Sequence, residues 1–181
     1  MTMIAKIATE DWEYSQMFRL NYQTFVDEIP HHPTNSSGQL VDKFHDKNKY
    51  IIVLQDKEVI GMMSVNEHRP FSIDAKVSNM DALLPKFTKP FEIRLLAVKN
   101  EYRGSLVFMK LFAKLKDIIE EQKYDIGLIS GIVSQQKLYT KIGFVPFGNL
   151  VGKAPAQFQP MYITYNLYLK GLENMNLVNK L

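Results

Sequence analysis

The sequence contains no cysteine, no long apolar run and no linker rich in proline, glycine or serine. Without cysteine, disulfides, thiolate metal ligands and a cysteine nucleophile are excluded. No apolar run approaches ~18 residues, and the N-terminus lacks a charged segment followed by an apolar one, so we expect neither a membrane span nor a signal peptide. We therefore predict a cytoplasmic protein with one domain over residues 1–181.

An excess of charge of one sign is also missing. The chain has 22 Lys and Arg against 19 Asp and Glu, a net charge of +3, and the lysines are spread along it. Nucleic acid is therefore not an expected partner, whereas an anionic cofactor or an acidic carrier protein fits this balance. The adjacent His31 and His32 lie between prolines and have no third ligand at metal-ligand spacing, which favours a solvated loop and no metal site.

The apolar patterns predict a mixed α/β protein in which a central sheet carries helices on both faces, with ligands bound beyond the carboxyl ends of its strands. Strands are predicted at residues 3–8, 50–55, 59–66, 93–98, 125–133, 144–147 and 161–169, the last with alternating Tyr162, Tyr165 and Tyr168. Residues 56–58 are predicted to form a short hairpin turn, and Gly61 to mark a bulge or a close backbone approach. Helices are predicted from residue 10 to about 28, at 79–84, at 106–122 and at 134–141, the last ended by Gly143. A loop at 30–38 and an insertion at 70–90 are expected to border the substrate pocket.

The stretch from Glu92 to Leu106 is the segment around which the predicted fold is organised. An apolar strand ends in a polar turn, and a long helix begins directly after Gly104. Glycine can adopt backbone angles closed to other residues, Ser105 can cap the helix, and the first helical amides then lack carbonyl partners. Together with the cation of Arg103 they would form a phosphate site. The alternative is an ordinary strand-to-helix connection with a surface arginine.

A second motif, Tyr139-Thr140-Lys141-Ile142-Gly143-Phe144, follows some thirty residues after the first, Leu96-Ala97-Val98-x4-Arg103-Gly104-Ser105. In this order and separation the two motifs resemble those of the GNAT acyltransferase superfamily, and the resemblance extends over residues 50–169. It implies a GNAT-like fold: a mostly antiparallel central sheet with a splayed parallel strand pair, here residues 93–98 and 125–133. The pantetheine arm of an acyl thioester would lie in the gap between these two strands.

The resemblance also implies a set of residues that hold acetyl-CoA or another acyl-CoA as co-substrate. Main-chain groups of the central strand would bind the pantetheine arm, and amides of the following turn would bind the pyrophosphate. These residues are Leu96, Ala97, Val98, Tyr102, Arg103, Gly104, Ser105 and Leu106. Three positions depart from the family pattern. Leu106 and Phe108 stand where small residues are expected, and Ile132 stands where the family often has asparagine.

A narrower resemblance concerns Phe25-Val26-Asp27-Glu28 and Asp42-Lys43-Phe44-His45. With the insertion and Glu92-Ile93 they are similar to the N-acyl amino acid and acyl-homoserine lactone synthases, a GNAT branch that can draw on acyl carrier protein. This similarity implies acceptor-binding roles for Phe25 and Arg94. Asn21 stands where that branch has arginine, His45 stands where it has a second aspartate, and Arg94-Leu95 replaces a small residue followed by arginine. A polar lead-in to a strand is the alternative interpretation of residues 42–46.

An alkyl ammonium has a pKa near ~10.4, so an amine acceptor must lose a proton before it attacks a thioester. Glu92 is the candidate base, and its alternative role is a surface carboxylate paired with Arg94 or Lys89. A strand amide near Leu96 or Ala97 would stabilise the oxyanion. Tyr139, placed near the sulfur by the resemblance, is the candidate proton donor to the thiolate; its alternative is packing.

These observations predict an N-acyltransferase that moves an acetyl or longer acyl group from acyl-CoA to a small-molecule amine or amino acid by direct attack. An acyl carrier protein-dependent synthase is one alternative. The other is a non-catalytic acyl-CoA-binding sensor or interaction module, which the bulky Leu106 and Phe108 favour. The sequence is compatible with a monomer or a homodimer.

Overall fold

The computed structural model describes residues 2–104, 106–153 and 157–175. The chain forms two compact units. Unit 1 comprises Met1–Val65 and Arg94–Asp117, and unit 2 comprises Asn66–Ile93 and Ile118–Leu181. The single domain expected from the sequence stays a prediction.

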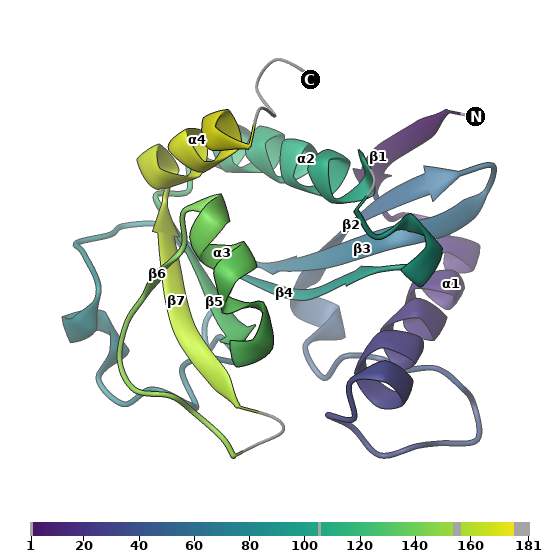
Figure 1. Ribbon diagram of the computed structural model, residues 1–181, viewed down its shortest axis with the longest axis horizontal. Helices are drawn as coiled ribbons and strands as arrows, with labels where there is room; N and C mark the ends of the chain where they lie inside the picture. The colour runs from purple at the N-terminus through teal and green to yellow at the C-terminus, as the bar shows by residue number, and fades with distance from the viewer. Residues whose placement is uncertain (1, 105, 154–156, 176–181) are drawn as a thin grey trace. The chain divides into compact units, whose positions relative to one another are not determined.

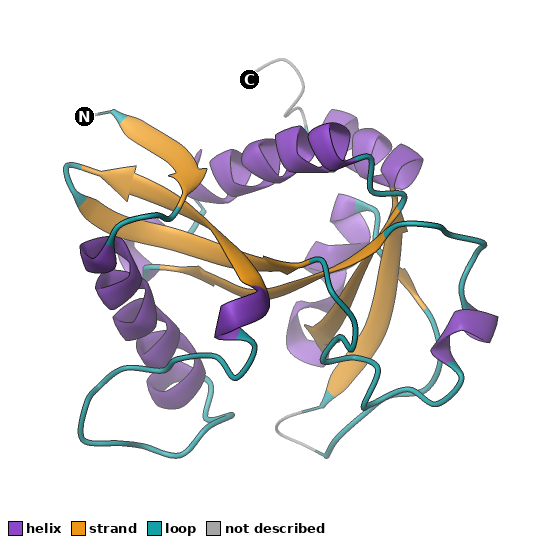
Figure 2. Ribbon diagram, turned by 180° about the vertical axis from the view of Figure 1, so that it is seen from behind, coloured by secondary structure: helices purple, strands orange, loops and turns teal. Residues whose placement is uncertain are grey.

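The strands follow the order β1-β2-β3-β4-β5-β7-β6 in one mixed sheet of seven strands (Figure 1). The central strand β4 (Pro90–Val98) begins in unit 2 and ends in unit 1. Its pairing with β5 (Ile126–Ile132) is parallel, whereas β5 and β7 (Phe158–Thr164) are antiparallel. The predicted mixed α/β fold class is confirmed, and Figure 2 shows its strands in orange.

Unit 1 contains the first three strands, the end of β4 and two long helices. Its elements are β1 (Met3–Ile7), α1 (Asp11–Tyr22), the π-helix η1 (Gln23–Glu28), the 3-10 helix η2 (His45–Lys47), β2 (Asn48–Gln55), most of β3 (Glu58–Asn66), the 3-10 helix η4 (Asn100–Tyr102) and most of α2 (Leu106–Gln122). The predicted hairpin between β2 and β3 is confirmed. Asp56 and Lys57 have positive φ angles, 48° and 65°, as a two-residue turn of this type requires.

Helix α2 approaches strand β3 closely at Gly61, the glycine predicted to mark a bulge or a close backbone approach. A Cβ atom added to Gly61 would lie 2.4 Å from Cγ1 of Val107, so only glycine fits at this crossing. Around it, buried apolar side chains of unit 1 form the core; they include Met17, Leu20, Tyr50, Ile52, Val59, Met62 and Ala97.

Unit 2 contains the insertion and the C-terminal elements. These are the 3-10 helix η3 (Met80–Leu83), β5, the 3-10 helix η5 (Val133–Gln135), α3 (Gln136–Ile142), β6 (Val145–Pro146), β7 and α4 (Tyr165–Asn174). Gly143 ends α3 with a φ of 111°, as predicted. In the part of the chain that the structure describes, no helix is both long and apolar enough to span a membrane.

The predicted last strand, residues 161–169, is wrong in its second half. Strand β7 ends at Thr164, whose hydroxyl accepts a hydrogen bond from the Leu167 amide at 3.4 Å and so caps α4. Tyr165 and Tyr168, read as part of a strand pattern, are three residues apart and therefore also share a helix face. Gly171 allows α4 to lie against α3, because an added Cβ would be 1.6 Å from the carbonyl oxygen of Ile142.

Candidate active site

The parallel ladder between β4 and β5 is short. It comprises Pro90 with Ile126, Phe91 with Gly127, and Glu92 with Leu128, whereas β5 pairs with β7 over all seven of its residues. Three residues beyond Glu92, Leu95 has a φ of 55° in the middle of β4. A leucine in this left-handed region is strained by about 1–3 kcal/mol, and such residues cluster at functional sites. The register and the backbone of β4 thus both change just after Glu92.

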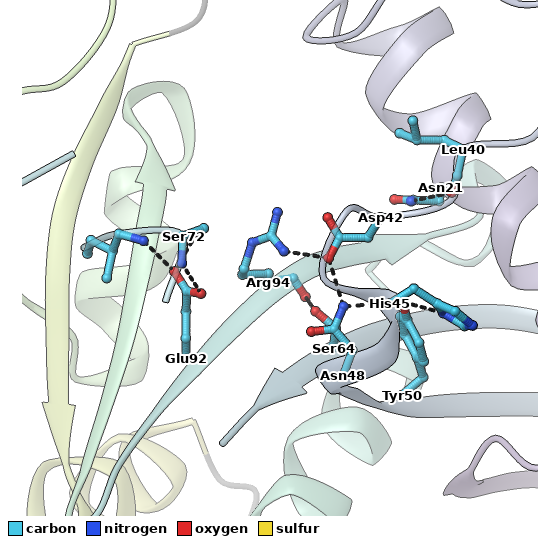
Figure 3. Close-up of polar contacts among 11 residues, drawn as sticks. Asn21, Leu40, Asp42, His45, Asn48, Tyr50, Ser64, Ser72, Glu92 and Arg94 are labelled. Carbon is cyan, nitrogen blue, oxygen red and sulfur yellow. Dashed lines mark hydrogen bonds and ion pairs between the residues drawn. The ribbon is translucent and has the colours of Figure 1, made fainter. Parts of the chain in front are cut away.

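Glu92 is fully buried in unit 2, with an exposed fraction of 0%. Its Oε2 accepts a hydrogen bond from the Ser72 amide at 2.8 Å, and its Oε1 accepts from the Ser72 hydroxyl at 2.6 Å and the Ile73 amide at 2.9 Å (Figure 3). The alternative of a surface carboxylate is therefore wrong. Three of its roughly four lone-pair sites are therefore occupied, and a base role would use the remaining site on Oε2.

The insertion that supplies these donors is itself well anchored. Arg69 forms ion pairs with Asp74 at 2.6 Å and Asp81 at 2.7 Å, and its hydrogen bonds lower the pKa of the Asp81 carboxyl despite the opposing effect of burial. Phe71, Ile73 and Met80 pack against the side chains of Ile126, Leu128 and Phe147. Ser72 is thus held in place on both sides, and sequence reasoning missed its role because nothing local links it to Glu92.

Tyr139 lies on α3 in unit 2 and is half-buried. Its ring lies over Gly131 of β5, where a Cβ would be 2.8 Å from the Cδ2 atom, and meets the Phe144 ring edge to face at 6.3 Å. Burial raises the pKa of the Tyr139 hydroxyl, and a backbone hydrogen bond at Ile132 opposes this effect. The hydroxyl therefore keeps its proton at neutral pH, as a proton donor must.

Arg94 belongs to a polar network in unit 1. Its Nη1 donates to Oδ2 of Asp42 at 2.5 Å, its guanidinium lies 4.9 Å from the centre of the Phe44 ring, and its carbonyl oxygen accepts from Ser64 at 3.1 Å (Figure 3). The Asn48 amide donates to the same Asp42 oxygen at 2.7 Å. Asp42, with a side chain only 6% exposed, is thus a fixed partner of Arg94.

The network continues from Asn48 to the aromatic residues of unit 1. Asn48 Nδ2 also lies 3.2 Å from the Tyr50 hydroxyl, which in turn lies 3.1 Å from Nδ1 of His45. Burial raises the pKa of Tyr50 to about 12, with the Asn48 hydrogen bond opposing the rise. The His45 ring meets those of Tyr14 and Phe18 edge to face. Residues 42–50 therefore form an ordered scaffold for Arg94.

Two buried oxygens of unit 1 have no hydrogen-bond partner among the described residues, Oδ1 of Asn21 and Oγ1 of Thr24. An unpaired buried polar group typically costs about 1–3 kcal/mol. Thr24 and Phe25 both lie on the π-helix η1, an element often found at functional sites. Phe25 packs on the core of unit 1 and stacks on the His31 ring at 6.5 Å. Only the departure at Asn21 signalled this feature in the sequence.

The turn predicted to bind phosphate is open at its glycine. Gly104 has a φ of 78°, and no atom lies within 4 Å of where a Cβ would stand. Ser105 lies outside the described residues. Leu106, the first residue of α2, is 51% exposed, and the Phe108 ring packs on that of Phe112 at 4.5 Å. The residues present are therefore compatible with an anionic group at the start of α2.

The Arg103 side chain contacts two residues of unit 1, Val98 and Glu28. Its Nε donates to the Val98 carbonyl oxygen at 3.0 Å, and its Nη2 pairs with Glu28 of η1. Both charged side chains of this pair are exposed, so it contributes at most about 1 kcal/mol and can be exchanged for another anion. Ala97 is buried in the core of unit 1, and Leu96 and Tyr102 are partly exposed.

Comparisons with known proteins agree with this architecture. Residues 20–113, more than half of the chain, match the family model described as an acetyltransferase (GNAT) domain. A comparison with curated proteins finds no match. The CoA-dependent acyl-homoserine lactone synthase BjaI, solved with MTA, is 16% identical, with 97% of this chain and 90% of that chain covered and a TM-score of 0.78.

Two further solved structures are similar. FeeM, an N-acyl amino acid synthase from uncultured soil microbes, is 14% identical, with 94% of each chain covered and a TM-score of 0.76. The AHL synthase LasI is 16% identical, with 90% of each chain covered and a TM-score of 0.72. At these identities the likeness shows the fold, while the family-model match confirms the resemblance seen in the sequence. The protein belongs to the GNAT acetyltransferase family and is an acyltransferase.

Proposed function

We propose that the protein transfers an acetyl or longer acyl group from acyl-CoA to the amine of a small acceptor, and that the acceptor is an amino acid. The observation that carries the proposal is the end of the β4–β5 ladder at Glu92, followed by the left-handed Leu95. Beyond this point β4 no longer continues that ladder, so main-chain groups on the side of β4 away from β3 are not taken up by β5 and can serve a ligand.

On the donor side, the amides of Leu96 and Val98 would hold the arm of the thioester, and the amide of Ala97 or Leu96 would donate to the acyl oxygen. The turn from Tyr102 to Leu106 would hold the phosphates. This is supported by the open surroundings of Gly104 and by an Arg103 cation whose present partner is an exposed carboxylate. Coenzyme A supplies an activated thioester, and the protein residues bind and orient it.

On the acceptor side, Arg94 is the proposed ligand for a carboxylate. Asp42 takes one guanidinium nitrogen, and Phe44 orients the guanidinium plane, so other N–H groups of Arg94 are available. An arginine fixed in this way suits bidentate recognition of a carboxylate. Phe25 would border the acceptor from η1. A carboxylate next to the reacting amine favours an amino acid over a simple amine.

For the chemistry, Glu92 would take the proton of the amine, directly or through a water molecule, on Oε2, which accepts a single hydrogen bond from Ser72. Tyr139 would give its proton to the departing thiolate, and its raised pKa keeps that proton available. Direct attack of the amine needs no covalent enzyme intermediate.

The test is release of free thiol from acetyl-CoA and from longer acyl-CoAs, with each of the standard L-amino acids and with simple amines. Release that depends on an amino acid is the expected result, and release with no dependence on any amine would overturn the proposal. Parallel reactions with an acyl group on acyl carrier protein distinguish the synthase-like alternative from an enzyme that uses acyl-CoA. Coenzyme A should also raise the melting temperature, since a ligand at ~100 times its dissociation constant adds about 2.7 kcal/mol of stability.

A further inference from the structure

Two neighbouring side chains of unit 1 present buried oxygens without partners. Asn21 is 1% exposed and Thr24 is 5% exposed. They stand three positions apart at the junction of α1 and η1, so they share one helix face. Oδ1 of Asn21 and Oγ1 of Thr24 accept no hydrogen bond from any residue in the described parts of the chain. Such positions are rare in folded proteins and call for an explanation.

The orientation of Asn21 is fixed by the chain. Its Nδ2 donates to the Leu40 carbonyl oxygen at 2.8 Å, and the Leu40 amide donates to the Phe18 carbonyl oxygen at 2.9 Å. In Figure 3 the nitrogen of the Asn21 carboxamide lies on the side of Leu40, and its oxygen lies on the side of Asp42. The carboxamide cannot turn over without breaking its bond to Leu40. Its oxygen is therefore held on the side of the carboxamide away from Leu40.

We propose that Asn21 and Thr24 are specificity-determining residues that accept hydrogen bonds from an N–H group of the acceptor, while Arg94 binds the acceptor's carboxylate. This inference rests on the proposed function. Arg94 offers only donors, whereas Asn21 Oδ1 and the unengaged Oδ1 of Asp42 are acceptors. A molecule with an amino group beside a carboxylate matches both kinds of group. An analogue without the amino group leaves the buried oxygens unpaired and is rejected.

The test uses Thr24, because valine has the same shape without the hydroxyl. If the hydroxyl serves only the acceptor, Thr24→Val should raise the KM for the amino acid about five- to tenfold and leave the KM for acyl-CoA unchanged. Its melting temperature should stay equal or rise, because a buried unpaired polar group is replaced by an apolar one. Thr24→Ser keeps the hydroxyl and should restore the parent KM. A purely structural hydroxyl would change the melting temperature and leave the KM alone.

An unchanged amino acid KM in Thr24→Val would overturn the inference, whatever happens to stability. If the parent protein shows no amine-dependent thiol release, the proposed function fails, and the inference is then measured by binding. In that case an L-amino acid from the standard set should raise the melting temperature of the parent more than that of Thr24→Val. An equal rise in both proteins, or no rise in the parent, would overturn it.

Discussion

Two carboxylates, Glu92 in unit 2 and Asp42 in unit 1, are almost completely buried but differ in how the chain uses their oxygens. Glu92 accepts three hydrogen bonds that occupy both oxygens, and two of the donors are main-chain amides. Among the described residues, Asp42 accepts side-chain hydrogen bonds from Arg94 and Asn48, both through Oδ2. The first carboxylate organises a loop, whereas the second keeps one oxygen available for a ligand.

The difference extends to the neighbours of each carboxylate. Ser72 donates hydrogen bonds to Glu92 from both its amide and its hydroxyl, so both donors are satisfied within unit 2. Around Asp42, the carboxamide oxygens of Asn21 and Asn48 have no partner in the described chain. Since unpaired buried groups lower stability, a site that retains them gains something else, and ligand binding is the simplest gain. The unpaired oxygens around Asp42 therefore fit the proposed acceptor site, and Nδ2 of Asn66 in unit 2 is a further buried group without a partner in the described chain.

The largest expected effect concerns Glu92 and tests whether its hydrogen bonds stabilise the fold. Glu92→Gln places an NH₂ group against donors that now meet a carboxylate oxygen, so we expect the free energy of unfolding to fall by about 2–4 kcal/mol. Urea denaturation followed by circular dichroism measures it. Ser72→Ala is the matched control, because it removes only the hydroxyl donor and should cost about 1 kcal/mol. Glu92→Gln with parental stability but no turnover would break the comparison and leave Glu92 as a base.

A second experiment tests whether Tyr139 of unit 2 acts as the proton donor in the reaction. Tyr139→Phe should lower kcat by about 10²-fold, the lower range for a lost proton donor, with little change in the KM for acyl-CoA. Because burial raises the pKa of Tyr139 above its ordinary value, the hydroxyl stays protonated, and kcat should not fall between about pH 7 and pH 9 on its account. Steady-state thiol release over this range measures both effects. Unchanged turnover would remove Tyr139 from the mechanism.

A smaller effect is expected at the ligand-facing cation of unit 1. Arg94→Lys keeps the charge but loses the planar fork and its contact with the Phe44 ring, so the KM for the amino acid should rise about tenfold. Lys43→Ala serves as the control, since Lys43 also lies over the Phe44 ring, at 5.0 Å. Equal rises in the two variants would show that the cation contacts with the Phe44 ring set the KM and that the planar fork of Arg94 does not.

The sequence was sufficient for features that local chemistry determines. The hairpin at Asp56 and Lys57, the strand-to-helix unit around Gly104 and the left-handed Gly143 each follow from turn residues between apolar segments. The start of α4 was missed because the spacing of Tyr165 and Tyr168 also fits a helix, and the cap at Thr164 resembles any strand threonine.

The environment of the candidate site could not be predicted in the same way. Glu92 meets donors twenty residues earlier in the chain, so its burial depends on how the insertion folds. Leu95 adopts a left-handed conformation that leucine disfavours, and no local signal announces it. Asn21 was visible as a departure from the resembling synthases, but the direction of its carboxamide is set by Leu40, which only the tertiary structure reveals.

The smallest expected effect concerns the exposed pair of Glu28 and Arg103, in which a carboxylate of unit 1 binds a residue proposed to hold the phosphates. Removing the competing carboxylate in Glu28→Gln should lower the KM for acyl-CoA about two- to threefold and change stability by less than about 1 kcal/mol, because the pair is exposed. Glu101→Gln removes the same charge from an exposed position two residues before Arg103 and is the matched control. Steady-state thiol release gives the KM, and the melting temperature with and without coenzyme A gives an independent measure of affinity. A lower KM in Glu28→Gln alone means that Glu28 competes with the phosphates for Arg103, whereas equal changes in both variants would reduce the effect to net charge.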